Sequence, residues 1–293
     1  MVFCPCCPHS CAINRQRETG ICGAGTLPRV ARAALHHWEE PMFSGTRGSG
    51  TVFFSGCNLR CVFCQNHAIS MAQKGSLCTA EQLAGIFLSL QNQGAHNINL
   101  VTPTPHIETL KNAIPLAKRQ GLTIPLLYNC GGYERVEALQ ALDGLIDIYL
   151  PDLKYFSAKR SAAYANASDY FFRATAAIEE MFRQVGTLAL DEHGIAKRGL
   201  LIRHLVLPCN LDETRMILHY IKDRFPPNTY LSLMGQYTPL GDNLPAPLRR
   251  QLTQREYAAA TQICADLGLY NVYVQKSGAA DTRFVPAFYD NLF

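Results

Sequence analysis

Residues 51–66 read TVFFSGCNLRCVFCQN and place three cysteines, Cys57, Cys61 and Cys64, within eight positions. The run before them, residues 51–56, is rich in β-branched and aromatic side chains, which predicts a strand. Three thiolates on the loop after that strand can hold three corners of a cubane iron–sulfur cluster, and the fourth iron stays open to a small molecule. A zinc site completed by a distant fourth ligand is the alternative, because a closed structural site needs four ligands.

The overall composition is that of a folded protein with an ordinary surface. The 293 residues suit one large α/β domain with an appendage, or two modest domains. Apolar residues make up 48% of the chain, which is enough for a sizeable core. The net charge is +4 and the basic residues are dispersed, so we expect no nucleic-acid binding.

Twelve cysteines are the unusual feature of this composition. The N-terminal residues MVFCPCCPHS lack the basic and apolar regions of a signal peptide, and no apolar run approaches membrane-spanning length. We therefore expect a cytoplasmic protein without a membrane contact, whose thiols stay reduced. Clustered cysteines then indicate metal ligands or catalytic groups. The scattered ones are expected to be small buried residues: Cys78, Cys130, Cys209 and Cys264.

From about residue 50 onward, short apolar runs alternate with amphipathic stretches. Strands are expected at 51–56, 97–101, 123–128, 145–150, 200–208, 229–235 and 271–275. Helices are expected at 79–94, 106–121, 133–142, 158–164, 170–184, 211–225 and 254–268. Capping boxes mark the starts of the first and the last of them, Thr79 with Gln82 and Thr253 with Glu256. Steady alternation implies parallel strands joined by right-handed crossovers. About six units are too few for a closed eight-stranded barrel, so we expect an α/β fold with a partial (β/α)6 parallel barrel. An open doubly wound sheet is the alternative.

The segment at residues 39–50, EEPMFSGTRGSG, is rich in glycine and serine and predicts a boundary. We therefore divide the chain into a small Cys-rich, metal-binding head at residues 1–45 and a barrel at residues 46–293.

The three-cysteine loop resembles that of the radical S-adenosylmethionine (SAM) superfamily, in its spacing and in the aromatic Phe63 before the last cysteine. Residues 50–66 are similar to the pyruvate formate-lyase activating enzymes. Residues 7–25, CPHSCAINRQRETGICGAG, resemble the Cys-rich N-terminus of some activating-enzyme homologues. The resemblance implies a [4Fe–4S] cluster on Cys57, Cys61 and Cys64, with SAM at its open iron. One electron would cleave SAM, and the resulting 5′-deoxyadenosyl radical would abstract hydrogen from a substrate.

Polar residues follow several predicted strands, at the end where barrel enzymes carry their chemistry. Thr102 and Thr104 stand where the superfamily often has a Gly-Gly-Glu stretch, so they are the candidates for the amino group of SAM. The alternative is a rigid turn in which His106 begins a helix. Asn129 replaces the Asp that helps to hold a cation in the activating enzymes.

The pair Asp152 and Lys154 is similar to an Asp-x-Lys motif of the activating enzymes. Residues two apart on an extended strand share a face, so we expect both side chains in the barrel mouth, with the lysine toward an anionic group. A surface salt bridge is the alternative.

Arg203 and His204 lie on opposite faces of their strand. The resemblance implies that Arg203 faces inward and contacts SAM, and a guanidinium suits a carboxylate through two hydrogen bonds. We expect His204 to be a packing residue. By the same resemblance, Gln236 lies near the adenosyl group and Phe63 packs on adenine. The resemblance also implies three further SAM contacts: Asn129, Asp152 and Lys154.

The head contains a second candidate metal site, with two, three and ten residues separating Cys4, Cys7, Cys11 and Cys22. Four thiols can close a zinc site or hold a second iron–sulfur cluster, and both interpretations stay open. Cys6 is a spare that could replace a neighbour. A segment this small gains from a metal because it buries little core.

The resemblance implies an oxidoreductase that activates a glycyl-radical partner enzyme, with a flavodoxin- or ferredoxin-type protein as its reductant. A radical SAM enzyme acting on a small molecule or on another protein residue is the first alternative. A non-catalytic iron–sulfur or zinc protein is the second.

Overall fold

The computed structural model describes residues 4–70, 74–240, 243–275, 286 and 288. The strands are β1 (Arg29–His36), β2 (Ser49–Phe54), β3 (Ser76–Leu77), β4 (Ile98–Val101), β5 (Leu126–Cys130), β6 (Ile148–Pro151), β7 (Ala189–Leu190), β8 (Ala196–Leu205), β9 (Tyr230–Met234) and β10 (Val272–Val274). The helices are α1 (Pro41–Ser44), α2 (His67–Ser70), α3 (Ala80–Asn92), α4 (Ile107–Arg119), α5 (Val136–Gln140), α6 (Ala158–Ala165), α7 (Tyr170–Val185), α8 (Leu211–Arg224) and α9 (Gln254–Asp266), with 3₁₀ turns η1 (Thr104–His106) and η2 (Ala246–Leu248).

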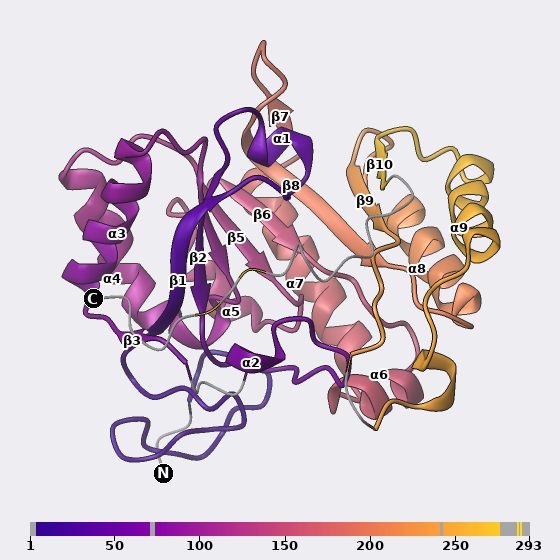
Figure 1. Cartoon of the computed structure of the whole chain (residues 1–293), viewed down its shortest axis with the longest axis horizontal. Coiled ribbons are helices and arrows are strands. Elements are labelled where there is room, and N and C mark those ends of the chain that lie inside the picture. The colour runs from indigo at the N-terminus through magenta and orange to yellow at the C-terminus, as the bar shows by residue number, and fades with distance from the viewer. Residues whose placement is uncertain (1–3, 71–73, 241–242, 276–285, 287, 289–293) are drawn as a thin grey trace.

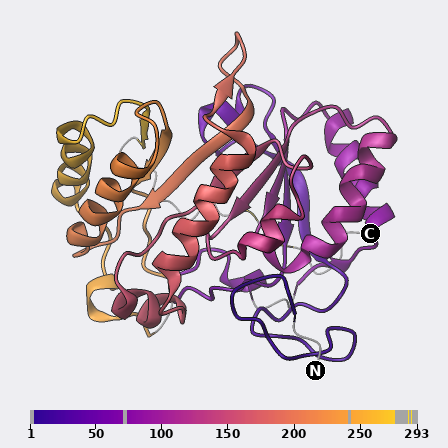
Figure 2. The ribbon, with the colours of Figure 1, turned by 180° about the vertical axis from the view of Figure 1, so that it is seen from behind.

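These strands form one sheet in the order β10-β9-β8-β6-β5-β4-β2-β1-β3, and β7 pairs with β8. All pairs from β2 through β10 along this order are parallel, whereas β1 and β3 add an antiparallel edge. The parallel strands follow one another in chain order, so right-handed crossovers bring the helices to one face (Figure 2). A doubly wound sheet reverses its strand order, so the partial-barrel prediction is confirmed. Among the described residues the sheet does not close.

The inner face of the sheet is apolar at one end and polar at the other. Leu127, Ile148, Leu150 and Leu201 are buried against Phe43 of α1, which plugs the end of the barrel where the strands begin. Continuing each strand by two residues on the same face leads to Asn129, Asp152 and Arg203. The polar candidates therefore converge at the carboxyl ends of the strands.

Two helix starts were predicted in detail and are confirmed. Thr79 caps α3 and Thr253 caps α9, each in a capping box with the residue three positions on, Gln82 and Glu256. Among the described residues, no helix is both long enough and apolar enough to cross a bilayer.

Residues 4–28 contain neither a helix nor a strand and form loops beneath the sheet, next to α2 (Figure 1). The sheet itself already begins at Arg29, because β1 pairs with β2 from Val30 to His36. The boundary predicted near residue 45 therefore falls inside the structured unit. The segment outside the sheet is the shorter one, residues 4–28, and we call it the head below.

The capping box of α9 gives a prediction about stability. Thr253→Ala removes the hydroxyl that accepts the backbone N–H of Glu256 at 3.2 Å, so we expect a loss of about 1 kcal/mol in the free energy of unfolding. Urea denaturation measures this change, and Thr253→Ser should restore most of the stability. An equal loss in both variants would show that the methyl group, not the cap, is responsible.

Candidate active site

The loop after β2 gathers three thiols around one cavity. Gly56 has a φ of 94°, which lets the chain turn sharply out of β2. The backbone N–H of Leu59 donates to Cys57 Sγ at 3.4 Å, and that of Cys64 donates to the Cys61 carbonyl at 3.1 Å. Cys57, Cys61 and Cys64 are half-buried and line a cavity of about 290 Å³.

The chemistry of these three thiols fits an iron–sulfur cluster. In a cubane each thiolate binds a different iron, and three thiols on one loop leave the fourth iron open to a small molecule. Burial raises the pKa of all three thiols, that of Cys64 to about 12. A bound metal would replace their protons.

A buried ion pair lies beside the thiols. Lys154 Nζ pairs with the Asp152 carboxylate, and both side chains are only 17% exposed, so this is no surface salt bridge. Burial acts to lower the pKa of Lys154, but the negative charge of Asp152 outweighs it and raises that pKa. The ammonium group is therefore positive at neutral pH. The hydroxyl of Tyr155 also donates to Cys61 Sγ, at 3.5 Å.

Arg203 lines the cavity, as predicted, and its guanidinium is held by two carboxylates. Glu40 accepts from Arg203 Nε at 2.8 Å and from Nη2 at 2.5 Å, and Glu39 also accepts from Nη2. Asn129 Oδ1 lies 3.4 Å from Nη1. His204 points to the other side of the strand, where Leu153 O and Thr214 Oγ1 are its partners.

The cavity brings together seven of the eight residues predicted to contact SAM: Phe63, Thr102, Asn129, Asp152, Lys154, Arg203 and Gln236. The eighth, Thr104, is buried behind the wall, where its hydroxyl donates to Glu134 Oε1 at 2.6 Å. His106 is also buried there, with its Nε2 3.1 Å from the Ser55 carbonyl, so it is a packing residue. The contacts of the seven residues with SAM stay predictions.

The sequence analysis missed several residues of the cavity wall. Glu39 and Glu40 lie in the stretch taken as a domain boundary, and the only signal was an acidic pair directly before Pro41. Trp38 precedes them at the rim and is 65% exposed. Tyr237 packs edge-on against Phe63, with ring centroids 5.5 Å apart, and no spacing in the sequence pointed to it.

Glu134 was also missed, and its environment is unusual for a carboxyl group. Its two oxygens accept hydrogen bonds from Thr104 Oγ1 at 2.6 Å and Tyr128 Oη at 3.1 Å. Burial raises the pKa of Glu134 to about 8, although these hydrogen bonds act in the opposite direction. The carboxyl group is therefore largely protonated at neutral pH.

This shift predicts a pH dependence of stability. Between about pH 4.5 and 8 the unfolded chain releases the Glu134 proton while the folded chain keeps it, so the folded state loses stability as the pH rises. Glu134→Gln carries no such proton. The difference in unfolding free energy, wild type minus variant, should therefore fall with rising pH, by at most about 1.4 kcal/mol per unit. Urea denaturation at several pH values tests this, and a constant difference would contradict it.

Known proteins resemble this chain in sequence and fold. A model of the radical SAM superfamily matches residues 51–189. An uncharacterized protein of Methanocaldococcus jannaschii, MJ0674, is 28% identical over 281 residues, covering 92% of this chain and 76% of the relative. SuiB of Streptococcus suis, solved with its precursor peptide SuiA, is 12% identical with a TM-score of 0.51, covering 76% of this chain and 47% of SuiB.

The FeFe-hydrogenase maturase HydG from Carboxydothermus hydrogenoformans also has a TM-score of 0.51 at 12% identity, covering 80% of this chain and 55% of HydG. The chain thus spans about half the length of these two solved structures, and at such low identity they show a shared fold alone. The three-cysteine loop, the partial barrel and the superfamily match agree with one another. Residues 51–189 of this chain therefore form a radical SAM domain.

Proposed function

We propose that the chain is a radical SAM enzyme whose reaction takes place in the cavity beside Cys57, Cys61 and Cys64. The superfamily implies a [4Fe–4S] cluster and SAM. When bound, the cluster would supply the electron that splits SAM into methionine and a 5′-deoxyadenosyl radical, which abstracts hydrogen from a substrate. The observation that carries the proposal is that the three thiols and the seven predicted polar and aromatic residues line one cavity.

The cavity offers a partner for each chemical part of SAM. Lys154 and Arg203 are cations suited to its carboxylate, and Glu39 and Asp152 are acceptors suited to its amino group. Phe63 with Tyr237 forms an aromatic wall that suits adenine. Because Arg203 is held by two carboxylates, Glu39 and Glu40, whereas Lys154 is paired with Asp152, we assign Arg203 to holding the wall and Lys154 to the carboxylate.

The most specific form of the proposal is an activating enzyme that takes hydrogen from a glycine of a partner protein. It is supported by the similarity of residues 50–66, and of the motif formed by Asp152 and Lys154, to the activating enzymes. A second support is the position of Trp38 at the rim of the cavity. An exposed aromatic side chain at the rim suits contact with a protein surface. A flavodoxin- or ferredoxin-type protein would be the reductant, in the cytoplasm. The Cys-rich head favours one alternative, a radical SAM enzyme for a small molecule or another protein residue.

A purely non-catalytic iron–sulfur or zinc protein is the weakest alternative. The charges of Arg203, Glu40, Asp152 and Lys154 are all largely buried. Removing charged groups from water is costly, and a binding protein that needs only its thiols would gain nothing from them. A reaction on a charged cosubstrate gives these groups a role.

A pair of cysteine variants tests the enzymatic proposal. Cys61→Ala removes a cluster ligand, so we expect 5′-deoxyadenosine formation by the reconstituted, chemically reduced protein to fall to background. Cys78→Ala is the matched control, because Cys78 is fully buried and its thiol donates to the Ser76 carbonyl at 3.5 Å. It should retain most of the activity. If the loaded wild type forms no 5′-deoxyadenosine, both enzyme proposals fail.

The identity of the substrate has a separate test. A glycyl-radical enzyme from the same organism, mixed anaerobically with the reduced protein and SAM, should develop the EPR doublet of a glycyl radical. Omitting SAM or using Cys61→Ala should abolish the signal. Efficient SAM cleavage without a glycyl signal, or a genome that encodes no such enzyme, would favour the small-molecule or other-residue alternative.

A further inference from the structure

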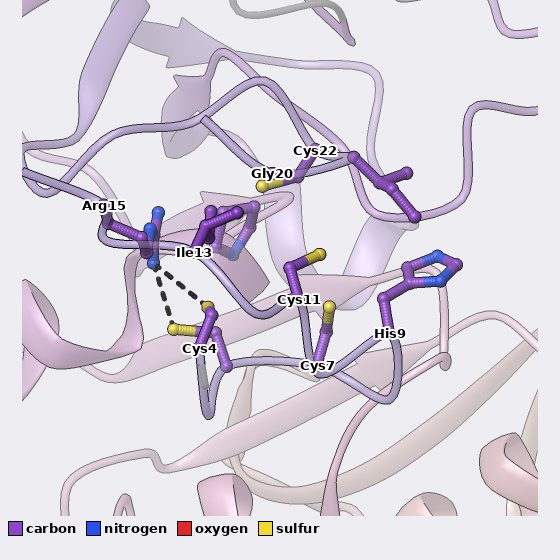
Figure 3. A pocket seen from close by; sticks show the side chains of 11 residues that line it. Cys4, Cys7, His9, Cys11, Ile13, Arg15, Gly20 and Cys22 are labelled. Carbon is purple, nitrogen blue, oxygen red and sulfur yellow. Dashed lines mark hydrogen bonds between the residues drawn. The ribbon is translucent and has the colours of Figure 1, made fainter. Parts of the chain in front are cut away.

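The head gathers five thiols around one small enclosed space. Its lining includes all the cysteines of the N-terminal segment: Cys4, Cys6, Cys7, Cys11 and Cys22 (Figure 3). The loops that present them are held by a few backbone bonds, such as Cys4 N–H to the Cys11 carbonyl at 2.8 Å and Ser10 N–H to the Cys7 carbonyl at 3.1 Å. Without a helix or a strand, a segment of this length needs another source of order, and thiols suit a metal centre.

Arg15 supplies an independent sign of a missing partner. Its Nη1 donates to Cys6 Sγ at 3.1 Å and lies 4.0 Å from Cys4 Sγ (Figure 3). Its Nε and Nη2 are buried, and within the described structure neither has a hydrogen-bond partner. Unsatisfied buried N–H groups are costly, especially on a charged group. The bridging sulfides of a cluster would accept such bonds, whereas a single zinc ion adds no acceptor.

The surroundings of the sulfurs select four of the five cysteines as ligands. Cys4, Cys7, Cys11 and Cys22 are separated by two, three and ten residues, whereas Cys6 lies directly beside Cys7 and accepts from Arg15 Nη1 at 3.1 Å.

Cys11 and Cys6 differ in what surrounds their sulfurs. A Cβ atom on Gly20 would lie 3.1 Å from Cys11 Sγ, so the backbone of Gly20 comes close to that sulfur. Cys6 contacts Cys4 and Arg15 and is almost completely buried. It is the spare thiol.

The arrangement favours a cluster over a single ion. Three thiols close together with a fourth farther along the chain is a spacing typical of iron–sulfur proteins. The positive charge of Arg15 would offset the negative charge of a cluster with four thiolates.

The head also touches the first cluster loop directly. His9 Nε2 lies 2.8 Å from the carbonyl of Asn58, and the next amide, Leu59 N–H, donates to Cys57 Sγ. The ring of His9 packs edge-on against Tyr133, with centroids 5.3 Å apart. One peptide group therefore joins the Cys7–Cys11 turn to a ligand of the first cluster.

We propose that the head binds a second iron–sulfur cluster through Cys4, Cys7, Cys11 and Cys22, with Arg15 donating to its sulfur atoms and Cys6 left unbound. The site stands on the gathered thiols and on the unpartnered guanidinium. It does not depend on the substrate of the enzyme or on SAM cleavage.

The test is anaerobic analysis of iron, acid-labile sulfide and zinc in the reconstituted full chain, with Mössbauer spectra. We expect about eight irons per chain in the wild type, because each cubane contributes four. A variant with Cys57, Cys61 and Cys64 all changed to alanine leaves the head intact and should keep about four. About one zinc per chain with only four irons in the wild type, or no iron in the triple variant, would overturn the proposal.

Cys6 and Cys7 are adjacent in the sequence, so their serine variants are a matched pair that tests which thiols bind the cluster. Cys7→Ser and Cys22→Ser should each lose about four irons and keep the four on the Cys57 loop, which also shows that the barrel is folded. Cys6→Ser should keep all eight irons, although Cys6 is as deeply buried as Cys7. Loss of iron in Cys6→Ser equal to that in Cys7→Ser would contradict the assignment.

Discussion

The alternation of side chains along parallel strands is the constraint on which this structure depends. Because β2, β4, β5, β6, β8 and β9 run parallel in chain order, their carboxyl ends meet at one edge. Successive inner-face residues on one strand are two positions apart, so Leu127 leads to Asn129 and Leu201 leads to Arg203. The same strands that build the apolar plug around Phe43 therefore end in a polar cavity. A shift of register by one residue would bury the charges among the helices.

Pairing between opposite charges offsets the free-energy cost of burying the charged side chains at that polar end. The side chains of Arg203, Glu39 and Glu40 are at most 12% exposed, so each would be very costly alone. Burial acts to raise the pKa of Glu40, but Arg203 outweighs it and lowers that pKa. These three residues come from β8 and from the connection between β1 and β2. Their pairing ties the antiparallel edge of the sheet to the far side of the cavity.

Burial affects the protonation of the thiols differently from that of the paired carboxylates. Burial raises the pKa of Cys57, Cys61 and Cys64, and that of Cys7 to about 12. Thiols in such surroundings stay protonated, and a bound metal would have to replace their protons. Contact between His9 and the Asn58 carbonyl means that order in the head and order in the Cys57 loop support each other.

The sequence by itself determined the features that depend on short-range spacing. Three thiols within eight residues, the capping boxes at Thr79 and Thr253, and the alternation of strand and helix are all local, so they predicted the cluster loop and the parallel fold. Only the tertiary structure decided which polar residues share the cavity. Thr104 and Thr102 are two positions apart, yet a positive φ of 60° at Thr102 and the turn η1 send Thr104 to Glu134 instead. Glu40 reaches Arg203 across 163 positions. Such pairings depend on how distant segments pack, and that information is spread over the whole core rather than over any short stretch.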